Sequence, residues 1–319
     1  MKPLVVITGP TAVGKTEISI KIAKAINGEI ISADSIQVYK HMDIGSAKIT
    51  KEEMQGIRHY LIDEFEPDEE FNVHVFKEKT VKYINEIYKS GKIPIIVGGT
   101  GFYIQSVLYD IQFNDEVIDN TYRKELETIA KEKGNDYLHN MLKEVDEKSA
   151  LNIHKNNVKR VIRALEFYKN TGEKISTHNE EQAQNSSPYN FVYFVLNDKR
   201  ELLYDRIDKR VDVMFEKGLV NEVNNLLNMG YTRDLVSMNG IGYKEVVDYI
   251  NGKYSLEEAK EIVKRETRHF AKRQLTWFRR EKDVTMVNYF DYDSIDDTLK
   301  YMINILKEKD IIKNDKRNV

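Results

Sequence analysis

The segment ITGPTAVGKTEISI, residues 7–20, constrains the fold of this chain more than any other. It contains the spacing G-x-x-x-x-G-K-T, in which a loop from Gly9 to Gly14 is followed by Lys15 and Thr16. Such a loop presents backbone N–H groups and a helix N-terminus to a chain of phosphates, and its threonine hydroxyl is a ligand for Mg²⁺. The motif therefore predicts a di- or triphosphate site with Thr16 as the metal ligand, but it does not specify a reaction. The residues expected to line this site are Gly9, Pro10, Thr11, Ala12, Val13, Gly14, Lys15 and Thr16.

Apolar runs alternate with helical patterns in the first part of the chain, which predicts an α/β fold. The runs at 3–8, 28–33 and 92–99 are short, continuous and rich in β-branched residues, as buried parallel strands are. A helical pattern at 15–25 follows the first run. Right-handed crossovers of this kind produce a mostly parallel sheet with helices on both faces. We therefore expect a P-loop NTPase-like fold.

The sequence changes character at about residue 113, which predicts a helical insertion domain. From 113 to 188 the chain is polar and helix-patterned, and it lacks apolar strand runs. A strand-like run at 189–196 then returns the chain to the sheet. The predicted organisation is a core formed by 1–112 and 189–319, the second part with basic C-terminal helices, and an insertion at 113–188.

The composition excludes several kinds of site. The chain has no cysteine, so it forms no disulfide, no thiolate zinc site and uses no cysteine nucleophile. No run approaches the roughly 20 apolar residues that a membrane-spanning helix needs, and the apolar start is too short for a signal peptide. We expect a cytoplasmic monomer that does not contact a membrane.

A basic stretch at 260–280 predicts contact with a polyanion. It holds eight Lys or Arg and two Glu, whereas the net charge of the whole chain is −3. Lys260, Lys264, Arg268 and Lys272 recur every four residues, so they form one stripe along a helix. Like charges at this spacing destabilise an isolated helix by roughly a few tenths of a kcal/mol per pair. A phosphate backbone would offset that cost; the alternative is a solvated basic face.

Two strand ends hold candidate catalytic residues. Asp34 follows the run at 28–33, at the edge of a parallel sheet where ligands bind. It is either a general base or Mg²⁺ ligand, or the N-cap of a helix with Gln37 completing a capping box; Gln37 is also suited to reading adenine. The run at 92–99 continues into Gly98-Gly99-Thr100-Gly101, where a P-loop hydrolase usually has an acidic Mg²⁺ ligand. The missing acid argues against NTP hydrolysis, and the small residues indicate either a passage or a tight turn.

These motifs together resemble the bacterial tRNA dimethylallyltransferases, also called tRNA isopentenyltransferases. The similar segments, in the order typical of that family, are GPTAVGKT, DSIQVYKHMDIGSAK, VGGTGFY, NVKRVIRALE, DKRVDVMFEKGL, IGYKE and AKRQLTWFRR. The similarity runs from about residue 4 to about residue 280, without a departure at a motif position. It implies transfer of a dimethylallyl group from dimethylallyl diphosphate to N6 of the adenosine directly 3′ of the anticodon, tRNA position 37. Diphosphate is released, and N6-isopentenyladenosine remains in the tRNA.

The resemblance also implies roles for individual residues. The P-loop would hold the donor's diphosphate together with Mg²⁺ and one or both of Arg206 and Arg210. Asp34 would act as the base on the adenine amine, and Thr100 would line the channel in which donor and acceptor meet. The expected contacts with the tRNA anticodon stem-loop are Asp34, Ser35, Ile36, Gln37, Thr100, Arg123, Val158, Lys159, Arg160, Val161, Ile162, Lys272 and Arg273.

Two other functions stay open on the residues alone. A P-loop kinase acting on a nucleoside or small metabolite would need a γ-phosphate site and an acidic Mg²⁺ ligand. A non-catalytic, GTPase-like RNA-binding module would need a guanine-recognition motif, and the sequence shows none. ATP consumption without RNA would favour the kinase, and RNA binding without prenyl transfer would favour the module.

Overall fold

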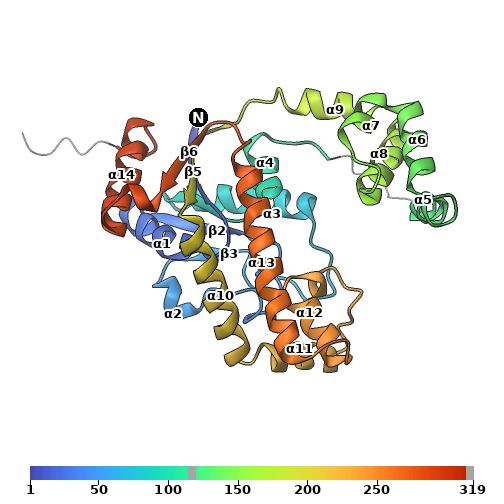
Figure 1. Cartoon of the computed structure of the whole chain (residues 1–319). Coiled ribbons are helices and arrows are strands. Elements are labelled where there is room, and N and C mark those ends of the chain that lie inside the picture. The colour runs from blue at the N-terminus through green and yellow to red at the C-terminus, as the bar shows by residue number, and fades with distance from the viewer. Residues whose placement is uncertain (114–119, 314–319) are drawn as a thin grey trace, which may run out of the picture. The chain divides into compact units, whose positions relative to one another are not determined.

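The computed structural model describes residues 1–113 and 120–313, and the chain divides into two compact units (Figure 1). Unit 1 comprises Met1–Leu108 and Pro188–Val319, and unit 2 comprises Tyr109–Ser187. Unit 1 contains a sheet covered by helices, and every described element of unit 2 is a helix. The predicted borders at 113 and 188, and the tRNA-binding role given to the insertion, stay predictions.

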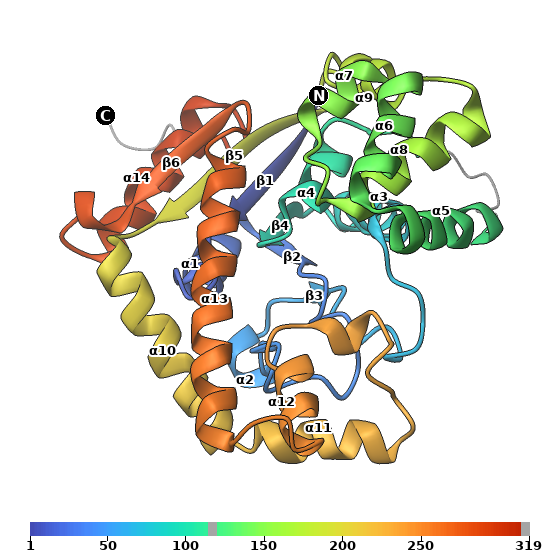
Figure 2. The ribbon, with the colours of Figure 1, turned by 45° about the vertical axis from the view of Figure 1, so that its right-hand side comes forward.

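Six strands form the sheet of unit 1 (Figure 2). In chain order they are β1 (Lys2–Thr8), β2 (Gly28–Ala33), β3 (His59–Tyr60), β4 (Ile93–Gly98), β5 (Tyr189–Asn197) and β6 (Val284–Asn288). Their spatial order is β3-β2-β4-β1-β5-β6, and every described pairing is parallel, which confirms the predicted α/β fold. The sequence did not indicate β3 or β6, because β3 has two residues and β6 is a partly exposed edge strand.

The central strands are apolar along their length because both faces of the sheet are covered. Successive strand residues point to opposite faces. Val5 and Ile7 of β1 share an apolar cluster with residues of α1 (Lys15–Ile26) and α14 (Ile295–Glu308). The alternate residues Leu4 and Val6 are equally buried. On β2 and β4 lies α3 (Val73–Lys89), which packs against α4 (Gly101–Leu108). The other helical elements of unit 1 are α2 (Lys51–Met54), α10 (Arg200–Glu216), α11 (Leu219–Asn228), α12 (Tyr243–Ile250), α13 (Leu256–Phe278) and the 3-10 turns η1 (Ser237–Asn239) and η2 (Tyr289–Asp291).

The parallel arrangement brings the carboxyl ends of the strands to one edge of the sheet. Thr8 and Ala33 are both in register with Gly98, so β1, β2 and β4 end at the same level. Ligands of open parallel sheets bind at this edge. The residues that follow the strands there are Gly9, Asp34, Gly99, Asp198 and Tyr289. None of the described helices has both the length and the apolar character that crossing a lipid bilayer requires.

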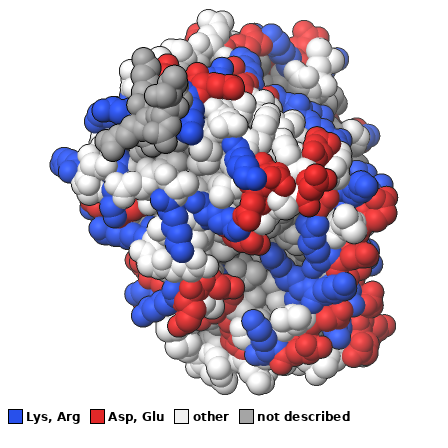
Figure 3. Space-filling view, turned by 90° about the vertical axis from the view of Figure 1, so that its left-hand side faces the viewer, with Lys and Arg blue, Asp and Glu red and all other residues white. Residues whose placement is uncertain are grey.

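Three residues of the basic stripe on α13 have intramolecular partners, and the contact with a polyanion stays a prediction. α10 and α13 run side by side (Figure 2). Lys260 and Lys264 lie 3.2 and 2.9 Å from Asp212 Oδ1, and Arg268 pairs with Asp208. Carboxylates of α10 therefore offset the repulsion along the stripe, and the repulsion itself is no evidence for bound RNA. Figure 3 shows similar mixing on one face of the molecule, where basic and acidic side chains lie next to one another.

Unit 2 is built around a small apolar core of its own. Its described helices are α5 (Asn120–Lys133), α6 (Asn135–Val145), α7 (Glu147–Asn152), α8 (Val158–Thr171) and α9 (Ile175–Gln182). Leu126, Leu138, Leu142 and Leu165 are almost completely buried and bring α5, α6 and α8 together. This unit therefore has the internal packing of a separate helical domain.

A buried carboxylate, Asp146, fastens α6, α7 and α9. Its side chain is the N-cap of α7, and Asp146 is also the C-cap of α6. It accepts hydrogen bonds from the backbone N–H and hydroxyl of Ser149, at 3.0 and 2.7 Å, and from the same groups of Ser176, at 3.0 and 2.8 Å. Burial raises the pKa of Asp146, but these hydrogen bonds outweigh burial and hold the pKa below its ordinary value.

Replacing Asp146 with alanine is expected to lower the free energy of unfolding by about 2 kcal/mol or more, because four donors lose their acceptor. The native pKa is depressed, so the carboxylate stabilises the fold above its ordinary pKa of about 4, and the contribution is lost as the pH falls through the native value. Urea unfolding of wild type and Asp146→Ala should differ at neutral pH and converge below about pH 4.

Asp136→Ala is the control for this measurement, since Asp136 is an exposed carboxylate of α6 that pairs with Lys155. Its removal should change the stability by less than about 1 kcal/mol. Equal stability of Asp146→Ala and wild type at neutral pH would contradict the structural role of Asp146.

Candidate active site

The P-loop connects β1 to α1 in a conformation that requires glycine at both ends. The φ angles of Gly9 and Gly14 are 145° and 94°. A Cβ at Gly9 would lie 2.5 Å from the carbonyl oxygen of Leu196, so no larger residue fits there. Gly14 is the N-cap of α1 and no side chain caps this helix. The first N–H groups of α1 are therefore available to an anion in the loop.

Lys15 folds back onto the loop that precedes it. Its Nζ donates to the carbonyl oxygens of Gly9 and Pro10, at 3.0 and 2.8 Å. Burial and the neighbouring Arg210 guanidinium lower the pKa of Lys15 to about 7, and the nearby Asp34 carboxylate opposes the shift. Three charged side chains from α1, α10 and the end of β2 are thus near neighbours. An anion that enters the loop would take the place of these carbonyl oxygens as the acceptor of the hydrogen bonds from Lys15.

Asp34 lies in a turn and begins no helix, so the structure contradicts the capping-box alternative. Its Oδ1 accepts the backbone N–H groups of Ile36 and Gln37, at 2.9 and 3.2 Å. Oδ2 takes part in none of the hydrogen bonds described for this side chain. The N–H of Thr100 donates to the carbonyl of Ala33 at 3.2 Å, which holds Thr100 next to Asp34. Two of the predicted catalytic residues therefore meet at the edge of the sheet.

The amide of Gln37 is used to close the loop that contains it. Its Nε2 donates to the carbonyl oxygens of Ser46 and Ala47, both at 3.2 Å. In the free protein this amide therefore stabilises the segment 34–48. To recognise an adenine, the Gln37 amide would have to give up these two hydrogen bonds and form new ones with the base.

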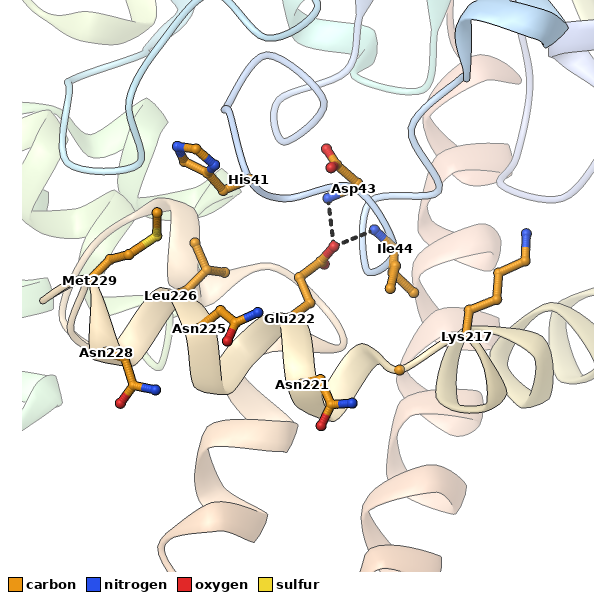
Figure 4. Close-up of a pocket in the computed structure, with 11 residues that line it drawn as sticks. His41, Asp43, Ile44, Lys217, Asn221, Glu222, Asn225, Leu226, Asn228 and Met229 are labelled. Carbon is orange, nitrogen blue, oxygen red and sulfur yellow. Dashed lines mark hydrogen bonds between the residues drawn. The ribbon is translucent and has the colours of Figure 1, made fainter.

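Glu222 of α11 anchors the same segment from outside (Figure 4). Its carboxylate accepts the N–H groups of Asp43, Ile44 and Gly45, at 2.9, 2.7 and 3.0 Å, and the hydroxyl of Tyr243 at 2.8 Å. The pocket drawn in Figure 4 lies along this contact, between the loop and α11. Because the carboxylate has four donors already, this contact is a structural joint. It connects two of the motifs singled out above, DSIQVYKHMDIGSAK and IGYKE.

Gln274 of α13 joins the P-loop to the end of β4. Its Oε1 accepts the backbone N–H of Thr11 at 2.9 Å, and its Nε2 donates to the carbonyl of Gly99 at 3.0 Å. The side chain is nearly inaccessible to solvent. Within the predicted cradle, the Thr11 N–H is therefore already engaged, and the N–H of Val13 donates to the carbonyl oxygen of Pro10 at 3.4 Å.

The glycines of the GGTG turn are required because other parts of the protein occupy the space that a side chain would need. A Cβ at Gly98 would lie 2.2 Å from the carbonyl oxygen of Ala33, and one at Gly99 would lie 2.1 Å from Gln274 Nε2. At Gly101 it would lie 2.2 Å from the indole nitrogen of Trp277. The space predicted as a passage for substrate is thus filled by backbone and by side chains of α13 at these three positions, and the tight-turn alternative holds.

Arg206 and Arg210 lie one turn apart on α10 and differ in their partners. Arg206 forms an ion pair with Asp198, whose side chain is almost buried at the end of β5. Within the described parts of the chain, no carboxylate lies in ion-pair distance of Arg210. The pKa of Lys15 shows that the charge of Arg210 acts on the P-loop.

In unit 2 the predicted tRNA contacts divide into core and surface residues. Arg123 makes two hydrogen bonds to Glu166, at 2.9 and 2.7 Å. The side chains of Val161 and Ile162 are buried in the apolar core and do not face a ligand. The exposed members of the set in this unit are Lys159 and Arg160.

On α13, Lys272 and Arg273 are exposed. Neither forms an ion pair within the part of the chain that the structure describes, in contrast to Lys260, Lys264 and Arg268. Arg273 lies over the ring of Phe270, with 5.9 Å between guanidinium and ring centre. These two cations are free to meet a phosphate.

The sequence analysis missed Gln274, although it quoted the motif that contains it. Ala271, Gln274 and Phe278 are spaced as one face of a helix, and all three are buried. A polar residue between apolar neighbours on such a face must find partners inside the protein. That pattern is the signal that would have found it.

A metal ion would depend on the ligand for most of its coordination. The described residues contain no group of three or more His, Asp or Glu side chains placed to hold an ion. The exposed Thr16 lies in the first turn of α1, where its hydroxyl fits an ion shared with bound phosphates. The residues therefore suit Mg²⁺ that arrives with a diphosphate.

Comparisons with known proteins agree with this arrangement. Residues 37–281 match the family model described as IPP transferase. The chain is 61% identical over 313 residues to a tRNA dimethylallyltransferase of Lachnoclostridium phytofermentans, covering 98% of this chain and 100% of the relative. It is 56% identical over 300 residues to the enzyme of that name from Acetivibrio thermocellus, covering 94% and 96%.

Solved structures show the same relationship. A full-length tRNA isopentenylpyrophosphate transferase from Bacillus halodurans is similar with a TM-score of 0.74 and 46% identity, over 97% of each chain. A eukaryotic dimethylallyltransferase acting on tRNA has a TM-score of 0.82 and 30% identity, over 97% of this chain and 80% of that one. The resemblance noted in the sequence is confirmed, and the chain belongs to the IPP transferase family, that of the tRNA dimethylallyltransferases.

Proposed function

We propose that this protein transfers a dimethylallyl group from dimethylallyl diphosphate to N6 of the adenosine directly 3′ of the anticodon, tRNA position 37. Diphosphate is released, and the tRNA retains N6-isopentenyladenosine. The observation that carries this proposal is the meeting of Lys15, Arg210 and Asp34 at one sheet edge. This arrangement places a cationic cradle beside a carboxylate. Relatives at 52–61% identity are named for this reaction, which supports the proposal.

In this proposal the P-loop binds the leaving group, which is the diphosphate. When the allylic C–O bond breaks, the electron pair stays on the diphosphate, and the dimethylallyl fragment becomes a delocalised cation. Lys15, Arg210 and the N-terminus of α1 stabilise the charge that develops on the diphosphate. Arg210 is the better candidate for the clamp, because Arg206 is held by Asp198.

Mg²⁺ would be held by the Thr16 hydroxyl together with oxygens of the diphosphate. Bound there, the ion supplies Lewis-acid neutralisation of the leaving group. The chain's own contribution is a hydroxyl at the first turn of α1 and the N–H groups beside it.

The carboxylate of Asp34 acts on the acceptor, which is the N6 amine of the adenine. The lone pair of an adenine N6 amine is conjugated into the ring, so the amine is a weak nucleophile until a proton is removed. Asp34 is the base in this proposal: Oδ1 is fixed by Ile36 and Gln37, which leaves Oδ2 for the proton. The adenine must leave the anticodon-loop stack to reach it, at a cost of about a few kcal/mol. Thr100 would line the site where it arrives.

The exposed cations form the tRNA-binding part of the proposal. Lys159 and Arg160 at the start of α8, and Lys272 and Arg273 on α13, are the predicted contacts whose side chains are accessible. Such contacts with phosphates would position the anticodon stem-loop without reading its sequence. The protein would act as a monomer in the cytoplasm.

A kinase or a non-catalytic RNA-binding module fits the site less well. β4 ends at Gly98 and is followed by Gly99, where a P-loop kinase needs an acidic Mg²⁺ ligand. A carboxylate beside the phosphate cradle has no role in a module that only binds RNA.

The direct test is a mass measurement on tRNA. The protein is incubated with Mg²⁺, dimethylallyl diphosphate and an unmodified tRNA whose anticodon ends in A and is followed by adenosines. Digestion should yield an adenosine heavier by one dimethylallyl unit, located directly 3′ of the anticodon. If the tRNA stays unmodified after incubation and the protein turns over ATP, the P-loop would belong to a kinase or hydrolase instead.

Asp34→Asn is expected to reduce the turnover number by about 100-fold or more and to leave the Kd for tRNA nearly unchanged. The asparagine Oδ1 can still accept the N–H groups of Ile36 and Gln37, so the turn is kept while the base is lost. Single-turnover kinetics with saturating donor, alongside tRNA-binding titrations, separate the two effects. The matched control is Asp68→Asn, an exposed carboxylate. Turnover of Asp34→Asn equal to that of the control would remove Asp34 from the mechanism.

The lowered pKa of Lys15 predicts that diphosphate binding is coupled to proton uptake. Lys15 has a pKa of about 7 in the free protein, and a bound anion raises it by favouring the charged form. Affinity should therefore fall as the pH rises above about 7, by up to roughly tenfold per pH unit. Below that pH the lysine is already charged, and this dependence should disappear.

Calorimetric titration with inorganic diphosphate, in buffers of different ionisation enthalpy, measures the protons taken up. Lys15→Met is the reference, because it retains only the titration of the ligand itself. A wild-type pH profile that coincides with that of Lys15→Met would show that Lys15 does not titrate on binding.

A further inference from the structure

Tyr289 places a hydroxyl beside the P-loop that the free protein does not use. The residue follows β6 and lies at the carboxyl edge of the sheet, like Gly9 and Asp34. Its hydroxyl oxygen is shielded from solvent and has no hydrogen-bond partner among the described residues. A Cβ at Gly14 would lie 3.5 Å from that oxygen. The hydroxyl is therefore next to the N-cap of α1, where the helix N–H groups begin.

An unpaired buried hydroxyl needs an explanation, because the large majority of buried polar groups in proteins are hydrogen-bonded. The charged neighbours of Tyr289 do not supply a partner. Arg206 and Asp198 are paired with each other, and Asp198 also accepts the N–H of Lys199. Glu17 acts on the tyrosine only through its charge.

The hydroxyl keeps its proton and can act as a donor. Burial is the main cause that raises the pKa of Tyr289, and the negative charges of Glu17 and Asp198 add to it, against Arg206. A neutral donor suits this place for a second reason. Lys15 and Arg210 are positive neighbours, and Arg210 adds to the effect of burial in lowering the pKa of Lys15. A hydroxyl adds a hydrogen bond to an anion without adding another positive charge to the site.

We propose that the Tyr289 hydroxyl donates a hydrogen bond to an oxygen of the diphosphate held in the P-loop, which makes the segment after β6 part of the donor site. The inference rests on the proposed function, because it takes the P-loop ligand to be a diphosphate. The N–H groups of α1 and the tyrosine hydroxyl then approach the same anion from two elements that are far apart in the sequence.

This role predicts opposite effects of one substitution on the free and the bound protein. In free Tyr289→Phe a buried unpaired polar group is gone, so the melting temperature should be unchanged or higher. In the complex a hydrogen bond to a charged acceptor is lost, so the Kd for diphosphate should rise about 10- to 100-fold. A tyrosine that served only packing would show neither a gain in the free protein nor a selective loss in the complex.

The experiment is a calorimetric titration of inorganic diphosphate, with Mg²⁺, into the full chain and three variants. Tyr289→Phe tests the hydroxyl. Tyr292→Phe is the matched control, because Tyr292 follows in the same segment and packs its ring against Tyr301 instead of the P-loop. Lys15→Met reports whether the ligand occupies the P-loop at all. Thermal unfolding of each free variant accompanies the titrations.

The expected result is weaker binding by Tyr289→Phe, without a loss of melting temperature, and wild-type binding by Tyr292→Phe. If Lys15→Met binds diphosphate more weakly than wild type and Tyr289→Phe binds as wild type does, the inference is overturned while the proposed function stands. Equal losses in both tyrosine variants would assign the effect to packing and also overturn it. No binding by wild type would overturn the proposed donor site and this inference together.

Discussion

The side-chain amide of Gln274 is the contact on which the geometry of the site depends. One end accepts the N–H of Thr11 in the P-loop, and the other donates to the carbonyl of Gly99 at the end of β4. A side-chain amide can do both at once, since it carries a donor and an acceptor in one plane. Because the amide is buried, neither hydrogen bond competes with water. The position of the phosphate cradle is thereby fixed to the turn that carries Thr100 and, through Ala33, to Asp34.

The charges at this edge suit the proposed reaction. Burial, together with the nearby Arg210, lowers the pKa of Lys15 to about 7, so a fraction of the free lysine is neutral at that pH. Asp34 lies near enough to oppose that shift, so the base and the cradle influence each other before either substrate binds. Binding the anion would relieve the repulsion between Lys15 and Arg210. The diphosphate of the donor would thus neutralise the positive charges next to Asp34, the carboxylate that takes the proton of the acceptor amine in the proposed reaction.

The sequence predicted the parts of the fold that are buried on both faces and the parts of the site that follow them directly. β1, β2, β4 and β5 are continuous apolar runs, whereas β3 is two residues long and β6 has exposed positions, so neither leaves a pattern. The P-loop and Asp34 could be located because each comes straight after a predicted strand. The contact between Gln274 and Thr11 spans 263 residues, and no local rule predicts which strand edge a late helix will reach. The carboxylate partners of the basic stripe could not be predicted for the same reason, since they lie on another helix.

The segments DSIQVYKHMDIGSAK and IGYKE contain residues of two kinds. Asp34 lies at the carboxyl edge of the sheet, directly after β2, whereas others only hold the segment in place. Lys48, whose side chain is almost buried, donates to the carbonyl of Tyr39 and pairs with Asp43. Glu222 and Tyr243 fix the same loop from α11 and α12. Since Asp34 lies at the start of this loop, a substitution at the joint would act on the proposed reaction by displacing the Asp34 carboxylate.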